Sequence, residues 1–241
     1  MRVLAAAAAA MCFCAPSFSD SSTYPQPLAD ALAMGYAAPE DAFWRFTMRV
    51  SMNDAVMDVR FDGAQADGED WTLLSPASPD VLPEELSGMW AEMNTPDNPD
   101  DAGNERRLSV GSGGGLFFSP ETAQMIAGDV QLAAGGGYTF RPDLDPDSDD
   151  AESMAEHLNG EIALASSGHV ERIRIFAPAS FKPNPAARIH EFEMVMDFQS
   201  VEGLPAPVMT SMSTVVDVSA LFQRQQQNVR FDFSDVEYVE P

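Results

Sequence analysis

Apolar and polar residues alternate along most of this chain, and the alternation predicts β-strands. From residue 44 to residue 52, apolar side chains take every second position, with arginine, threonine and serine between them. A period of two is typical of a strand that buries one face and exposes the other to water. Related patterns predict further strands at 55–61, 170–176, 188–198, 208–218 and 228–239.

Turn residues separate these strands and indicate how they pair. Asn53-Asp54 predicts a tight turn after the first strand, and an acidic stretch then leads to a short strand at 71–74. Strands joined by short connections pair antiparallel, so this region is predicted to be a meander. By contrast, the three prolines of the segment 177–187 forbid a tight hairpin between its flanking strands. Shorter strands are predicted at 129–133, 138–141 and 161–165.

Helix signals are few and lie in the first two-thirds of the chain. They predict helices at 27–34 and 82–93, and a third from Ser119 to Ala127, where a serine cap precedes a proline. The whole pattern predicts one α+β domain over residues 20–241, with roughly nine or ten strands and two to four helices. Its expected form is a curved antiparallel sheet with helices packed over the inner face.

The first 19 residues have the composition of an export signal. Arg2 supplies a positive charge, residues 3–14 an apolar core, and residues 15–19 a small-residue cleavage site. A buried alanine-rich helix would need a polar face, which this segment lacks. Cys12 and Cys14 are the only cysteines, so the mature chain is expected to carry no disulfide and no thiolate site. We expect export to the periplasm through a Sec-type signal peptide.

Acidic residues outnumber basic ones by 38 to 13, which gives a net charge of −25. Such a chain repels nucleic acid and anionic lipid headgroups, so electrostatic binding to either is not expected. Many of the acidic residues lie in two predicted loops, near 95–105 and 143–152. We interpret the surplus as an acidic surface that favours solubility in an export compartment.

The residues that could carry chemistry form no catalytic or metal-binding pattern. The run Gly111–Gly115 lacks the spacing of a nucleophile elbow and the lysine of a phosphate loop, so a flexible linker is predicted. His157, His169 and His190 lie in separate segments without metal-ligand spacing. An acidic residue near each of them leaves a catalytic pairing open, although structural histidines are far commoner. We expect no enzyme activity, no cofactor and no metal site.

Methionine is abundant, with 14 residues in the chain, and many of them fall on predicted strand faces. Methionine is flexible and polarizable, so it suits surfaces that accept irregular apolar shapes. Ordinary core filling explains the same pattern equally well. Only a sheet curved widely enough to leave a cavity would make these residues its lining.

Several segments resemble the LolA-like group of periplasmic proteins, relatives of the outer-membrane lipoprotein carrier. They are FWRFTMRV at 43–50, WTLLS at 71–75, YTFRP at 138–142, HLNGEI at 157–162, VERIRIFAPASFKPNPAARIHEFEMVM at 170–196 and NVRFDFSDVEYV at 228–239. The resemblance covers most of the chain in outline. It implies an unclosed antiparallel β-barrel with helices covering its apolar concave face. It also implies that acyl chains are carried through the periplasm in that cavity.

Two functions follow, and they differ in whether the sheet encloses a cavity. In the first, a periplasmic binding or carrier protein holds an apolar ligand, such as a lipid or a lipoprotein acyl chain. In the second, a non-enzymatic envelope accessory protein with a solid core acts through its surface. We expect a monomer, with an apolar ligand and transient contacts to envelope membranes or proteins as partners. The expected lining residues are Trp44, Phe46, Met48, Phe192, Met194 and Met196.

The acidic run from Asp143 to Asp150 partly resembles a calcium-binding loop. With Asp145 as the first ligand, Asp147 and Glu156 take the third and twelfth positions. The sixth position is Asp150, however, where the sharp turn of such a loop requires glycine. We therefore expect a solvated loop whose like charges repel one another.

Calcium is expected to raise the melting temperature only slightly and without saturation, and magnesium should match it. The reason is general screening of carboxylates rather than coordination in a built site. Thermal unfolding at increasing concentrations of each cation measures this. The prediction is wrong if calcium alone gives a rise that saturates below roughly 10⁻³ M and disappears in the variant Asp145→Asn, Asp147→Asn, Glu156→Gln.

Overall fold

The computed structural model describes residues 24–39, 42–65, 68–95, 116–124, 126–142, 154–184, 186–220 and 223–240. The chain divides into two compact units: unit 1 contains residues up to 36 and residues 117–227, and unit 2 contains residues 37–116 and 228–241. The predicted signal peptide, the glycine-rich run and nearly all of both acidic loops lie outside the described residues. The interpretations of those segments therefore stay predictions. The prediction of a single domain over residues 20–241 also stays a prediction.

Unit 2 contains the predicted antiparallel meander. Its strands are β1 (Phe43–Met52), β2 (Ala55–Asp62), β3 (Trp71–Ser75) and the later part of β11 (Gln223–Val239), in the order β3-β2-β1-β11. The β1–β2 turn holds Asn53 at a φ of 51°, a left-handed conformation in which asparagine is enriched. The backbone N–H of Asn53 donates to the carbonyl of Asn228 at 2.8 Å, which ties this turn to β11.

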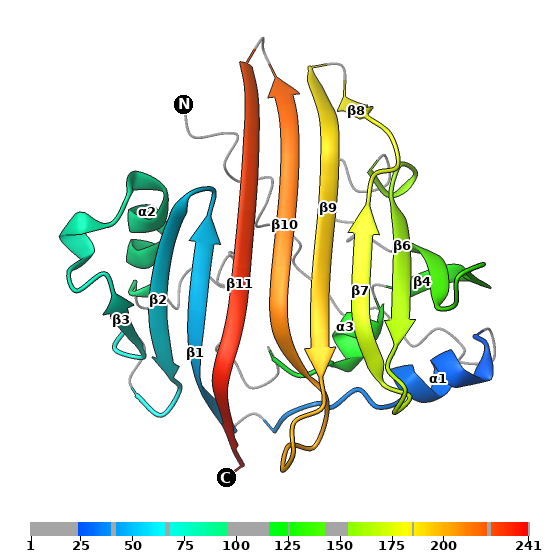
Figure 1. Ribbon diagram of the computed structural model, residues 1–241, viewed down its shortest axis with the longest axis horizontal. Coiled ribbons are helices and arrows are strands. Elements are labelled where there is room, and N and C mark those ends of the chain that lie inside the picture. The colour runs from blue at the N-terminus through cyan, green and yellow to red at the C-terminus, as the bar shows by residue number, and fades with distance from the viewer. Residues whose placement is uncertain are drawn as a thin grey trace, which may run out of the picture. The chain divides into compact units, whose positions relative to one another are not determined.

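Alternate residues of β1 build the core of unit 2, as the period of two predicts. Four of them are at most 1% exposed: Trp44, Phe46, Met48 and Val50. A short 3-10 helix, η3 (Pro79–Val81), precedes α2 (Glu84–Met93), which begins directly after Pro83. α2 lies beside β2 and buries Leu86 (Figure 1).

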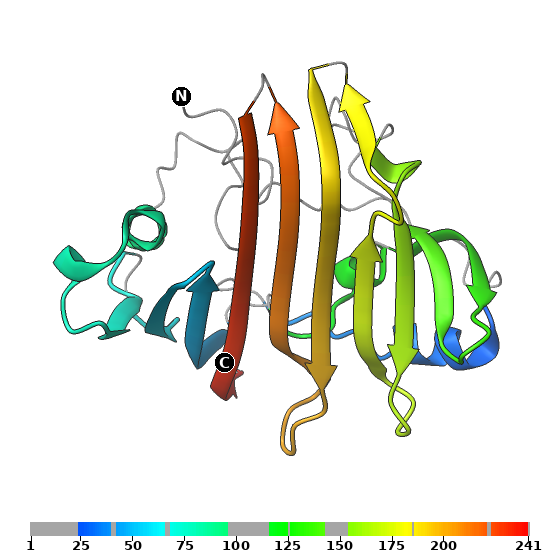
Figure 2. The same ribbon diagram turned by 45° about the horizontal axis from the view of Figure 1, so that its top comes forward.

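Unit 1 contains the remaining strands, each antiparallel to its neighbours. They are β4 (Ile126–Leu132), β5 (Tyr138–Pro142), β6 (Asn159–Leu164), β7 (Val170–Phe176), β8 (Phe181–Asn184), β9 (Ala187–Gln199) and β10 (Val208–Ala220). Their order is β10-β9-β7-β6-β5-β4, with β8 paired to β9. Figure 1 shows β10, β9, β7 and β6 side by side, and Figure 2 shows β4 at the edge of the group.

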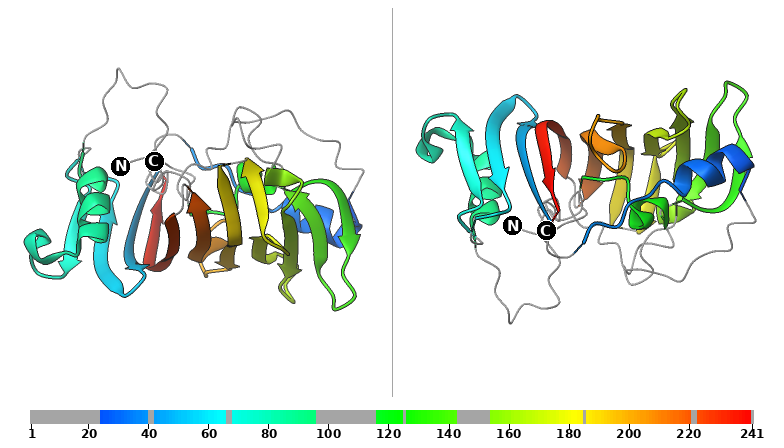
Figure 3. Two further views of the ribbon diagram at one scale, coloured as in Figure 1. Left: turned by 90° about the horizontal axis from the view of Figure 1, so that it is seen from above. Right: turned by 90° about the horizontal axis from the view of Figure 1, so that it is seen from below.

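One apolar cluster forms the core of unit 1, and two helices contribute to it. Helix α1 (Gln26–Leu32) buries Leu28 and Ala31 in this cluster, together with alternate residues of the sheet. Figure 3 shows α1 crossing the ends of the unit 1 strands. Helix α3 (Pro120–Gln124) has the predicted serine cap, because the N–H of Thr122 donates to Ser119 Oγ at 3.2 Å. Ala123 of α3 packs against the cluster.

The fold class is the predicted one: an α+β arrangement of an antiparallel sheet that does not close, with helices packed on its apolar face. Within the described part of each unit, no strand pair joins β4 back to β10 or β3 back to β11. An open sheet exposes its edge strands, whereas a closed barrel has none.

Three element boundaries differ from the sequence-based expectations, and strand pairing explains each difference. α3 ends at Gln124, three residues early, because Ile126 already pairs with β5. The proline segment contains β8, which tolerates Pro183 because it pairs only with β9 and lies at an edge. β11 begins at Gln223, five residues early, where it neighbours β10.

A substitution at Gly160 tests the packing between β5 and β6. Gly160 lies opposite Phe140, and a Cβ at this position would come within 2.2 Å of the phenyl ring. Because that ring is only 3% exposed and must move, Gly160→Ala is expected to lower the free energy of unfolding by about 1–3 kcal/mol in urea denaturation.

Gly88 of α2 is the matched control, because a Cβ there meets no atom within 4 Å. Gly88→Ala is expected to raise the free energy of unfolding by up to about 1 kcal/mol, through helix propensity alone. If Gly160→Ala is as harmless as Gly88→Ala, the described packing of Phe140 is wrong.

Candidate functional site

Alternate residues of β9 form an apolar row in the core of unit 1. Three predicted lining residues belong to it: Phe192, Met194 and Met196 are 5%, 8% and 5% exposed. Met196 lies opposite Ile173 of β7 on one side and Met212 of β10 on the other. The alternation thus places this triplet on one face, as predicted, while its role in ligand contact stays a prediction.

The apolar face continues onto β10, where burial is incomplete. Four side chains of β10 pack against the unit 1 core but are only half-buried: Met209, Met212, Val216 and Val218. Val216 lies opposite Phe192, so a nearly buried row borders a row that solvent still reaches. The sequence analysis missed this β10 row as a lining, although the alternation at 208–218 could have indicated it.

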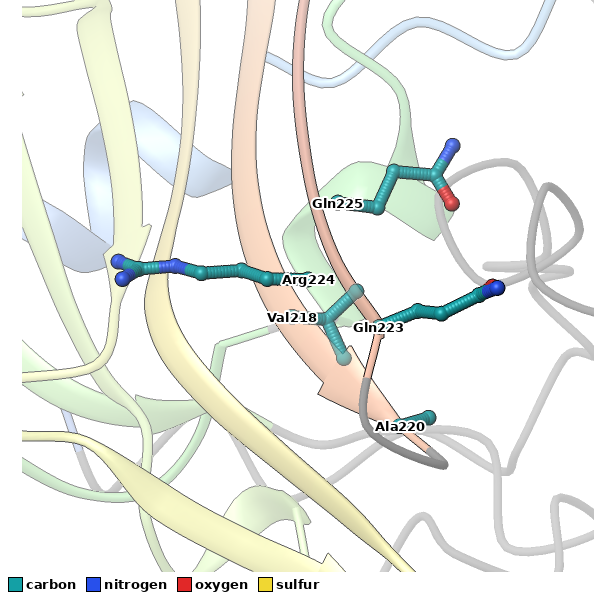
Figure 4. A pocket seen from close by; sticks show the side chains of 5 residues that line it. All are labelled: Val218, Ala220, Gln223, Arg224 and Gln225. Atoms are coloured by element: carbon teal, nitrogen blue, oxygen red, sulfur yellow. The ribbon is translucent and has the colours of Figure 1, made fainter.

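A pocket of about 360 Å³ lies where β10 leads into β11. Its lining residues are Val218, Ala220, Gln223, Arg224 and Gln225. Figure 4 shows Arg224 pointing to one side of the strand and Gln223 and Gln225 to the other. Val218 belongs both to this pocket and to the half-buried β10 row, so the apolar face ends at a polar rim.

The other three predicted lining residues belong to unit 2. Trp44 and Met48 are 0% exposed and Phe46 is 1% exposed. The ring of Phe46 stacks on Phe61 with centroids 5.1 Å apart, and its edge contacts include Phe233 at 5.8 Å. This triplet is packed among other side chains of its own unit, and neither of the two described pockets is lined by it.

The polar face of the unit 1 strands carries ion pairs across neighbouring strands. Arg174 of β7 donates to Glu161 of β6 at 3.0 Å and to Glu193 of β9 at 2.6 Å. Arg172 pairs with Asp197 of β9 at 2.6 Å, and this contact raises the pKa of the guanidinium. These arginines are therefore neutralised locally by acidic residues of the same sheet.

Two of the three histidines have partners that do not make a catalytic set. His157 stacks on Phe181, with ring centroids 4.6 Å apart. His190 Nε2 lies 2.9 Å from Ser219 Oγ, which is the distance of a serine–histidine pair. The nearby carboxylate of Asp217 is held instead by Arg224, whose Nε donates to Oδ1 at 2.8 Å. The carboxylate that a nucleophilic triad would require is therefore bound to an arginine instead of the histidine.

His169 lies in a more enclosed setting than sequence reasoning anticipated. Its side chain is 7% exposed, and Nδ1 is contacted by Ser167 Oγ at 2.8 Å and by Ser200 Oγ at 3.2 Å. The three residues line a pocket of about 310 Å³. Ser200 is 31 residues from His169 and reaches it only through the pairing of β7 with β9, so no local motif signalled this cluster.

The search for metal ligands and membrane spans was limited to the residues that the structure describes. Within them, no group of three or more histidine, cysteine, aspartate or glutamate side chains is placed to hold a metal ion. The described helices also include none with the length and apolar character needed to cross a membrane.

The sequence matches no protein-family model, and no curated protein matches it either. Among solved structures, the chain is similar to a LolA superfamily protein from Nitrosomonas europaea, with 11% sequence identity and a TM-score of 0.33. The alignment covers 88% of this chain and 91% of that chain. This is a distant likeness of fold, from which no function and no site residue follow.

The Asp217–Arg224 pair makes a pH-dependent contribution to stability. The hydrogen bond from Arg224 lowers the pKa of Asp217 below its ordinary value of about 3.9. Because the pKa of Asp217 is lower in the folded than in the unfolded state, the ionised carboxylate stabilises the fold at pH values above the unfolded-state pKa. This stabilisation is lost as the pH falls through the folded-state pKa. We expect Asp217→Asn to flatten the fall in melting temperature below about pH 4.

Arg224→Gln is the matched control, because it removes the guanidinium that donates to Asp217, whereas Asp217→Asn removes the carboxylate that accepts. It is expected to flatten the acid dependence of the melting temperature as much as Asp217→Asn does, and the double variant no further. Additive effects of the two substitutions would mean that the two residues act independently.

Proposed function

We propose that this protein binds and carries an apolar ligand, such as a lipid or an acyl chain, on the β9–β10 face of unit 1. The observation that supports this most is the burial gradient: Phe192, Met194 and Met196 are nearly buried, whereas the β10 row beside them is half-buried. The protein's own side chains leave part of this apolar row exposed, and an apolar ligand can cover the exposed part.

The chemistry of this face suits a flexible apolar ligand rather than a rigid polar one. Met194 and Met196 of β9 lie opposite β10, which contributes Met212 to the same face. Thioether side chains adapt to irregular shapes, so such a face accepts chains of different length. The pocket at the end of β10 adds the amides of Gln223 and Gln225, which are suited to a polar end group.

The proposed role is binding without chemical conversion. The serine–histidine pair at His190 lacks a free carboxylate, because Asp217 is bound to Arg224. No hydrogen bond within the described part of the chain connects the ring of His169 to a carboxylate either. These arrangements support a carrier more than a hydrolase.

We further propose that the protein works in the periplasm. The support is the sequence itself: an apolar segment after Arg2, small residues near position 17, and cysteines only within that segment. Apolar ligands that cross an aqueous compartment need a carrier that shields them from water, so the location and the proposed binding role agree.

A surface-acting accessory protein is the second candidate function, and one observation favours it. All six residues expected to line a cavity are at most 8% exposed, as they would be in a solid core. In that case the half-buried β10 row would contact another macromolecule or remain a feature of the surface. Ligand content distinguishes the two candidates.

Native mass spectrometry of protein purified from its own periplasm, combined with titration of an environment-sensitive apolar dye, tests the carrier function. A co-purified lipid that the dye displaces from a saturable site is the expected result. The carrier function is wrong if no lipid co-purifies and the dye signal rises without saturation.

Two adjacent valines of β10 provide a matched pair of variants. Val216 lies opposite Phe192 on the apolar face, whereas Val215 lies opposite Glu193 on the polar face. Val216→Thr keeps the side-chain shape but adds a hydroxyl to the proposed site, so it should weaken saturable dye binding about fivefold or more. Val215→Thr should leave the affinity unchanged, and equal effects of the two would place the ligand elsewhere.

A further inference from the structure

We propose that the cavity around His169 is a second binding site, for a small uncharged molecule with a carbonyl oxygen on a short apolar body. This site goes beyond the proposed carrier function, because none of its residues belongs to the β9–β10 apolar face. Its volume of about 310 Å³ is at the lower end of the range for small-molecule pockets.

Three segments of unit 1 meet at this cavity. The end of the α1 region contributes Met34, the β6–β7 turn contributes Ser167 and His169, and the β9–β10 loop contributes the rest. The residues from that loop are Ser200, Val201, Leu204, Pro205, Ala206 and Pro207. The lining is therefore apolar apart from one imidazole and two hydroxyls.

The imidazole of His169 is oriented by its serine neighbours. When both hydroxyls donate toward Nδ1, at 2.8 and 3.2 Å, the proton of the neutral ring resides on Nε2. The hydrogen bonds of the ring to described residues are both at Nδ1, and Nε2 is not one of the fully buried atoms without a partner, so solvent or a ligand can reach it. With its proton on Nε2, the ring offers a donor to the contents of the pocket, and a carbonyl oxygen is the simplest acceptor for it.

The absence of charge in the lining selects an uncharged ligand. The nine lining residues include no carboxylate, guanidinium or ammonium group, and His169 is the one titratable side chain among them, whereas the chain as a whole carries a net charge of −25. An anion would be repelled by the acidic surface and would find no guanidinium or ammonium in the cavity. Met34 and Val201 are 43% and 39% exposed, so the rim presents apolar surface to a ligand body.

The walls of the cavity are held by backbone contacts, which makes it a preformed site. The carbonyl of Pro207 accepts the N–H of Phe118 at 2.8 Å, and Val208 bridges to Phe117. On the other side, the carbonyl of His169 accepts the N–H of Ala165 at 2.9 Å. Gly168 takes a φ of +91°, which closes this turn beside the ring.

The test uses the full chain labelled with ¹⁵N-histidine and titrated with N,N-dimethylbutanamide. The chain has three histidines, so the imidazole signals can be assigned by single substitution. We expect a saturable shift of the His169 ring signals while those of His157 and His190 stay in place. A shift that is linear in concentration, or that is equal at all three rings, overturns the proposal.

Two variants and a second ligand complete the experiment. His169→Phe keeps a ring but removes the donor, and it should weaken binding of the amide about tenfold, measured by calorimetry. His190→Phe removes the other serine-paired histidine and should leave the affinity unchanged. Butanoate, an anion of similar chain length, should bind at least about tenfold more weakly than the amide; equal affinity would refute the selection for an uncharged ligand. The wild-type titration remains decisive if His169→Phe does not fold.

Discussion

The antiparallel pairing of β9 with β10 is the constraint on which the arrangement of unit 1 depends. Both strands are 13 residues long, and β9 also pairs with β7 and β8. A shift of one residue along β9 would turn Phe192 and Met194 to solvent and bring Glu191 and Glu193 into the core. The burial of the methionine row and the position of the polar face are therefore consequences of one register.

On the opposite face, charged residues reinforce the pairing of β7 with its neighbours β6 and β9. Arg174 bridges Glu161 and Glu193, on the strands to either side of β7. A surface ion pair contributes only about 0–1 kcal/mol, so these pairs add little to the free energy of unfolding individually. Their value lies in discrimination, because a shift of β9 by one residue would turn Glu193 and Asp197 to the apolar face and break their pairs with Arg174 and Arg172.

The described part of unit 1 contains two pockets whose linings differ in chemistry. The half-buried β10 row is apolar and methionine-bearing, and it leads through Val218 to a rim of amides. The cavity around His169 is smaller and combines one oriented imidazole with apolar walls. Unit 2, in contrast, has a core in which Phe46 packs against Phe61 and Phe233.

The sequence by itself determined most of the strands, their faces and the fold class, because a period of two in hydrophobicity records which side of a strand is buried. It placed Phe192, Met194 and Met196 on one face correctly, and it located the turn at Asn53 and the cap at Ser119. Only the tertiary structure decided how completely each apolar row is covered, since burial on β10 depends on neighbours far away in the chain. The contact of Ser200 with His169 likewise required the β7–β9 pairing, because hydrogen bonds between distant segments leave no local pattern in the sequence.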